Sequence, residues 1–128
     1  MKRLLPLVLL LGCATPKPGQ PPDIAFGRQE CARCGMIVSE ERFAAGYVAD
    51  DGEAMAFDDL GELLAAVEER PELRDRAWAR DLHGSGWLRL ADARLVRVAG
   101  LTTPMGTGWV AFAKPADAEA FVQARARR

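Results

Sequence analysis

Short apolar segments alternate with helical patterns through most of the chain. Residues 43–49 and 54–57 predict two strands, and the Asp-Asp-Gly sequence at residues 50–52 predicts a hairpin turn between them. A helix is expected to begin after Asp59, because a capping acid there precedes apolar residues at helical spacing. Pro71 is expected to end that helix, because proline cannot continue the hydrogen-bond ladder.

The second half of the chain repeats this alternation. Further strands are predicted at residues 77–79, 87–90, 95–98 and 109–112. Pro115 opens a final helix, in which three apolar residues are expected to face inward: Ala118, Phe121 and Val122. Residues 55–57 and 110–112 both end in Ala-Phe and precede a helix, which suggests two related β-β-α units in one α+β domain. The repeated stretch is short, so chance similarity explains this pattern equally well.

The N-terminus predicts a secretion signal and a lipid anchor. Two basic residues precede an apolar run at residues 4–11, which is far shorter than the roughly 20 residues of a membrane span. The sequence Leu-Leu-Gly-Cys at residues 10–13 resembles a bacterial lipobox, in which Cys13 is lipidated. The alternative is a plain cleaved signal with an incidental cysteine. A lipoprotein with Ala14 after its cysteine resembles those sorted to the outer membrane, and it would work in the periplasm.

The chain therefore divides into three segments: a signal peptide at 1–12, a lipidated N-terminus with a proline-rich tether at 13–23, and a folded domain at 24–128. The tether contains four prolines, which oppose helix and favour an extended chain. Removal of the signal peptide would leave 15 basic and 18 acidic residues in the mature protein.

Composition excludes several classes of protein. Basic and acidic residues are nearly balanced, at 17 and 18 of 128, whereas phosphate binding needs a basic surplus, so nucleic acid is not an expected partner. A hydrophobic fraction of 49% suffices for one compact core. Three cysteines are too few for a disulfide scaffold, and one histidine excludes a site built from several imidazoles in one chain.

The chemistry concentrates in the sequence Cys-Ala-Arg-Cys-Gly-Met at residues 31–36. Cys31, Cys34 and Met36 offer three soft sulfur donors, which favour Cu(I) over harder ions. A structural disulfide and a thiol-disulfide redox enzyme remain alternatives, although the polar residues before Cys31 do not resemble the buried strand that precedes a thioredoxin-like motif. Zinc would need about four ligands, and no second pair of cysteines or histidines is present.

A second candidate segment is the loop at residues 102–108, in which one proline and two glycines oppose regular structure. A lone methionine is more often a core residue than a ligand, but the position of Met105 in this loop makes a ligand role credible. His83 lies in a polar loop and is expected to be solvated, although it remains able to join a copper site. The acidic pairs at 50–51 and 58–59 are interpreted as solvated turn and cap residues.

These two motifs, in this order, resemble the NosL family of lipoprotein copper chaperones. The resemblance covers most of residues 26–124 and rests on Cys31-Ala32-Arg33-Cys34-Gly35-Met36, Asp81, Trp87, Thr103-Pro104-Met105-Gly106-Thr107-Gly108 and Ala111-Phe112. It implies a small α+β domain of two related β-β-α(-β) units, with mixed or antiparallel strands and helices packed on them.

The resemblance also implies a function. The family binds Cu(I) and delivers it in the periplasm for assembly of nitrous oxide reductase, the enzyme of denitrification, together with a membrane ABC-type complex, and catalyses no reaction. Carried over by position, the metal ligands are Cys31, Cys34, Met36 and Met105. This chain has Arg33 where family members usually have an aromatic residue. Another recipient cuproenzyme would require the same residues, so the sequence alone leaves the recipient open.

Overall fold

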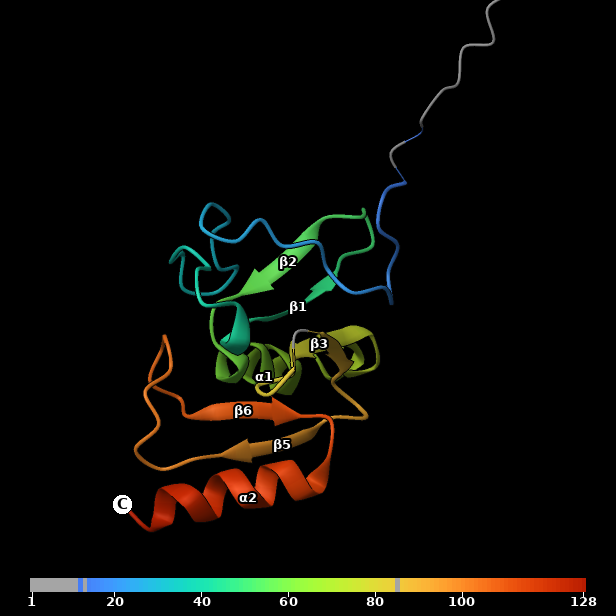
Figure 1. Ribbon diagram of the computed structural model, residues 1–128. Helices are drawn as coiled ribbons and strands as arrows, with labels where there is room; N and C mark the ends of the chain where they lie inside the picture. Colours follow the sequence, from blue (N-terminus) through green and yellow to red (C-terminus); the bar gives the residue numbers. More distant parts are fainter. Residues whose placement is uncertain (1–11, 13, 85) are drawn as a thin grey trace, which may run out of the picture.

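Two hairpin–helix units make up the computed structural model of the chain, which describes residues 12, 14–84 and 86–128 (Figure 1). The first unit consists of strands β1 (Ala45–Val48) and β2 (Ala54–Phe57) and helix α1 (Leu60–Glu69). The second consists of β5 (Arg94–Arg97), β6 (Trp109–Phe112) and α2 (Pro115–Ala126). The predicted α+β class is confirmed, and the β-β-α order occurs twice, as the Ala-Phe repeat suggested.

The segment between the units extends the first sheet. A short 3-10 helix η1 (Glu41–Phe43) precedes β1, and η2 (Pro71–Arg76), β3 (Ala77–Arg80) and β4 (Trp87–Arg89) follow α1. The first sheet has the strand order β2-β1-β3-β4 and the second pairs β5 with β6, with every pairing antiparallel. A parallel bridge between Asp81 and Ala111 joins the two sheets.

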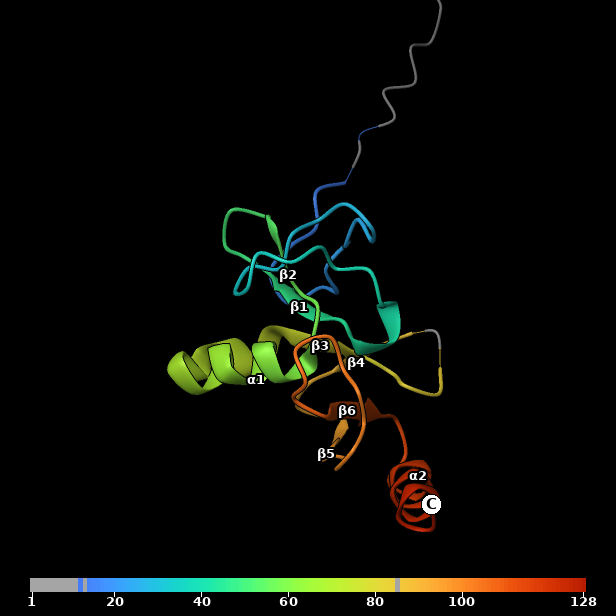
Figure 2. The same cartoon turned by 90° about the vertical axis from the view of Figure 1, so that its left-hand side faces the viewer.

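The elements stack so that α1 lies between the β1–β2 hairpin and strand β6, while α2 packs on β5 and β6 (Figures 1 and 2). The face of α1 that enters the core carries Leu60, Leu63 and Val67, all buried. On α2 only Ala118 is fully buried. The expectation that Val122 faces inward is wrong: it is 39% exposed, because α2 covers a sheet of only two strands and has no second layer on its other side.

Local sequence signals explain where the first unit turns and stops. In the hairpin turn, Gly52 has a φ of 87° and the Asp51 carboxylate accepts a hydrogen bond from the Glu53 amide at 2.9 Å. Asp59 caps α1 by accepting a hydrogen bond from the Gly61 amide. Helix α1 ends just before Pro71, as the sequence predicted.

The N-terminal segment lies along the β1–β2 hairpin. Pro22 is fully buried, and its ring would lie 3.1 Å from a Cβ added at Gly46 in the centre of β1. At the turn of the hairpin, the Thr15 methyl would lie 3.1 Å from a Cβ added at Gly52. Part of the predicted tether therefore packs on the domain (Figure 1).

The predicted lipid anchor lies outside the residues that the structure describes. The predicted signal peptide, apart from its last residue, and the predicted lipidation site Cys13 lie outside the described residues. Within the part of the chain that the structure describes, no helix has the length and apolar character needed to cross a membrane.

Candidate metal centre

The segment from Cys31 to Met36 forms a tight turn. Glu30 and Ile37 pair in an antiparallel bridge, and the Cys31 amide donates a 2.7 Å hydrogen bond to the Met36 carbonyl. Gly35 has a φ of 75°, which favours glycine, and its amide donates to the Cys31 carbonyl at 3.0 Å. We call residues 31–36 the cysteine turn.

Two kinds of contact hold the cysteine turn against the first β-β-α unit. The Ala32 amide donates a 2.7 Å hydrogen bond to the Ala56 carbonyl on the edge of β2. The Arg33 guanidinium lies 3.7 Å from the Glu62 carboxylate and 2.8 Å from that of Glu69, both on α1. Arg33 therefore ties the cysteine turn to α1 by charge.

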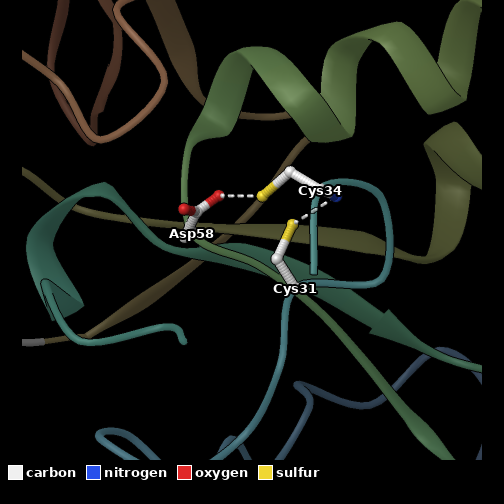
Figure 3. A group of neighbouring side chains, drawn as sticks. All are labelled: Cys31, Cys34 and Asp58. Atoms are coloured by element: carbon white, nitrogen blue, oxygen red, sulfur yellow. Dashed lines mark hydrogen bonds between the residues drawn. The ribbon is translucent and has the colours of Figure 1, made fainter. Parts of the chain in front are cut away.

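Cys31, Cys34 and Asp58 form the candidate metal centre (Figure 3). Their sulfur and carboxylate oxygen atoms all lie within 4.8 Å of one another, and the Cys34 thiol donates a 3.5 Å hydrogen bond to Asp58. Cys31 is 4% exposed and belongs to the core, whereas Cys34 is half-buried, and both are free thiols. Among the described residues this is the one group of three or more histidine, cysteine or acidic residues that could hold a metal ion.

The interpretation of Asp58 and Asp59 as solvated residues is wrong. Both side chains are buried at the junction of β2 and α1, because the cysteine turn contacts one and the loop at residues 102–108 contacts the other. Sequence reasoning therefore missed Asp58 as a member of the group. The one feature of the sequence that could indicate burial of Asp58 is its position directly after a predicted strand, because the residue that follows a core strand often still lies in the core.

Burial raises the pKa of the Cys34 thiol to about 12. A hydrogen bond from the Met36 backbone opposes this shift, while the neighbouring Cys31 and Asp58 add to it. In the metal-free protein Cys34 is therefore a neutral thiol at pH 7. A thiol-disulfide enzyme needs the opposite, a pKa lowered by a helix N-terminus or a cation, and the cysteine turn lies ahead of β1 rather than at a helix N-terminus.

The loop at residues 102–108, here the methionine loop, reaches the same junction from the other side. The Thr103 hydroxyl and the Met105 amide donate hydrogen bonds to one oxygen of Asp59, at 2.6 and 2.8 Å, and the Thr107 hydroxyl donates to the other. Asp58 therefore contacts Cys34 of the cysteine turn, while its neighbour in the chain, Asp59, holds the methionine loop.

The thioether candidates lie at the surface. Met36 is 59% exposed and Met105 is 40% exposed, which is unusual for methionine in a small domain. The assignment of Met36 and Met105 as ligands stays a prediction: Met36 belongs to the cysteine turn, and the Met105 amide is bound to Asp59. His83 is solvent-exposed, and its ring packs edge-on against Phe112 and Phe121 of the second unit rather than joining the Cys31–Cys34–Asp58 group.

The donor set decides which ions suit this centre. Two thiolates suit Cu(I), whereas the Asp58 carboxylate is a harder donor that also suits Zn(II). Without a metal, the Asp58 carboxylate accepts the hydrogen bond of the Cys34 thiol.

The structure is a small α+β domain in which two free cysteines and a carboxylate, gathered beside a surface turn, could hold a metal ion. The model of the NosL family matches residues 25–126, and the chain belongs to the NosL family. Membership indicates a copper-related function. No curated protein and no solved structure matches the chain.

Proposed function

We propose that the protein is a periplasmic Cu(I) chaperone that delivers copper for maturation of a cuproenzyme, with nitrous oxide reductase as the recipient. The observation that carries this proposal is the pair of free thiols, Cys31 and Cys34, gathered in one turn whose neighbouring residue Met36 is exposed. The methionine loop is hydrogen-bonded to Asp59, the neighbour in the chain of Asp58, which contacts Cys34.

The two kinds of sulfur suit binding followed by transfer. Thiolates bind Cu(I) tightly, whereas neutral thioethers bind it more weakly and can be exchanged for the ligands of a recipient. A buried metal would have to wait for an opening motion, but the exposed side chains of Met36 and Met105 can meet a partner directly. The proposed function needs no reaction, so we do not class the protein as an enzyme.

The proposed setting is the periplasmic face of a membrane. A lipid on Cys13 would anchor the chain, with the outer membrane favoured, and a membrane ABC-type complex would take part in the maturation of the recipient. The mature protein has no basic surplus that would draw it to nucleic acid.

The proposed function predicts a redox-dependent copper site. The reduced protein should bind about one Cu(I) per chain and bind Zn(II) much more weakly, because thioethers are poor zinc ligands. Oxidation of Cys31 and Cys34 should abolish most Cu(I) binding, because the thiolates are then lost. Titration against a coloured Cu(I) chelator, before and after oxidation, measures both effects.

Two results would contradict this proposal. Equal copper retention by the reduced and oxidised proteins would show that the cysteines are not ligands. Tighter binding of Zn(II) than of Cu(I) would favour a zinc site built on the two thiolates and Asp58, a second candidate that the position of this carboxylate supports.

The anchor is tested separately by Cys13→Ser. We expect the variant to appear in the soluble periplasmic fraction, because the lipid attachment point is lost. Its purified form should bind Cu(I) like the native domain, because the cysteine pair lies in a different segment. Fractionation of cells that express either form is the measurement, and unchanged membrane association of the variant would refute lipidation at Cys13.

A further inference from the structure

The methionine loop is attached to the domain chiefly through one buried carboxylate. Asp59 is 0% exposed and receives hydrogen bonds from Thr103, Met105 and Thr107 of the loop and from Gly61 of α1. Burying a carboxylate is unfavourable unless its oxygens are satisfied, so the four donors and the carboxylate depend on one another. The loop and the first turn of α1 therefore form a single hydrogen-bonded unit.

The first turn of α1 has room for this loop only because it contains a glycine. A Cβ added at Gly61 would collide with Cβ, Oγ1 and Cγ2 of Thr107. Glycine within a helix is unfavourable by about 1 kcal/mol relative to alanine. Its presence here therefore corresponds to the close approach of the methionine loop.

These contacts fix the backbone of Met105 but leave its side chain uncovered. The Met105 amide is bound to Asp59 at 2.8 Å, yet the side chain remains 40% exposed. A methionine that served to fasten the loop by packing would be buried. The loop is therefore held by polar contacts, and the thioether is free for another use.

We propose that Asp59, Gly61 and Thr107 are positioning residues that hold the Met105 thioether beside the cysteine pair. This inference rests on the proposed function, since it assigns how one ligand of that site is placed. Asp59 holds the methionine loop, and its neighbour Asp58 contacts Cys34 of the cysteine turn. The two loops are therefore bound by consecutive residues of the chain. None of the three positioning residues touches copper.

The clearest test uses Gly61→Ala, which adds a side chain under Thr107 and removes no ligand and no hydrogen-bonding group. Alanine also favours the helix, so α1 should stay folded. The matched control is Gly86→Ala, where an added Cβ meets open space. Cu(I) affinity should fall about 10-fold in Gly61→Ala, as is typical when an outer residue no longer supports a ligand, and should stay native in the control.

If the proposal is correct, the loss of Cu(I) affinity in Gly61→Ala is caused by displacement of the Met105 thioether. Met105→Ala should weaken Cu(I) binding by a similar factor, and the double variant Gly61→Ala/Met105→Ala should be no weaker than Met105→Ala alone, because a displaced ligand cannot be lost twice. X-ray absorption of the copper-loaded proteins should show one fewer sulfur neighbour in each of these variants. A role limited to stability would not change the number of sulfur ligands.

A second pair of variants keeps the test decisive if Gly61→Ala does not fold. Thr107→Val removes the hydroxyl that donates a hydrogen bond to Asp59, while Thr107→Ser retains this hydroxyl. We expect the valine variant to bind Cu(I) more weakly and the serine variant to bind it at close to the native affinity. Circular dichroism of the metal-free proteins confirms that both are folded.

The outcomes separate this inference from the proposed function. Native Cu(I) affinity in folded Gly61→Ala and Thr107→Val, additive losses in the double variant, or native affinity in Met105→Ala would each overturn the positioning role while copper binding by the native protein still stands. Failure of the reduced native protein to bind Cu(I) would instead overturn the proposed function itself.

Discussion

Cys34→Ser is expected to weaken Cu(I) binding by at least about 100-fold. This loss exceeds the effect expected for a residue that only supports a ligand without binding the metal. Serine keeps the size of the side chain but replaces a soft thiolate with a hydroxyl, which is a poor Cu(I) ligand. The fold should be retained, because Cys34 is only half-buried and lies in a turn. Chelator competition on the purified protein measures the affinity.

The same substitution at Cys13 provides the matched control. Cys13→Ser makes an identical chemical change in a segment remote from the cysteine turn in sequence, and it should leave copper affinity unchanged. Comparable losses in Cys13→Ser and Cys34→Ser would point to non-specific binding by thiols. A native affinity in Cys34→Ser would remove Cys34 from the site.

Asp59→Ala should lower the free energy of unfolding by about 3 kcal/mol, which corresponds to a decrease in Tm on the order of 10 °C. The substitution removes the N-cap of α1 and leaves the donors of Thr103, Met105 and Thr107 without their acceptor. Asp92→Ala is the control, because that side chain is exposed and its nearest cation lies 4.0 Å away. Thermal unfolding of the metal-free proteins measures the difference.

The pH dependence gives an independent check on Asp59. Burial raises the pKa of this carboxyl group, but the hydrogen bonds from Thr103, Thr107, Met105 and Gly61 outweigh burial and hold the pKa below its usual range. A group with a lowered pKa stabilises the folded state above its unfolded pKa of about 4, and this contribution is lost as the pH falls through the folded pKa. The stability gap between native and Asp59→Ala should therefore narrow in acid. A gap that does not narrow as the pH falls below about 4 would contradict this account.

Local patterns were enough to predict most of the fold. The hairpin, the cap at Asp59 and the end of α1 before Pro71 depend on neighbours in the sequence, and the pattern placed all three. The first strand begins at Ala45 rather than at Phe43, because residues 41–43 form a 3-10 helix. The β-β-α repeat was visible because both strands end in Ala-Phe. The inward orientation of Val122 was wrong because the number of layers on a helix is not a local property.

The site was only partly predictable for the same reason. Spacing alone brought Cys31 and Cys34 together, since three residues close one turn. The burial of Asp58 and Asp59 depends on contacts from segments more than 20 and more than 40 residues away in the sequence, and a single sequence contains no signal for those contacts. From the sequence, the acidic pair after the strand was therefore interpreted as a solvent-exposed cap. In the structure both residues are buried, and they contact the cysteine turn and the methionine loop.

The packing of the N-terminal segment on the hairpin has a consequence for orientation. Thr15 lies at the hairpin turn near Gly52, so a lipid on Cys13 would begin two residues from this point. Asp58 follows the far end of β2, six residues along the chain from Gly52, which corresponds to roughly 20 Å at the rise of a strand. If Cys13 carries the proposed lipid, the cysteine turn therefore lies toward the end of the hairpin remote from the attachment point.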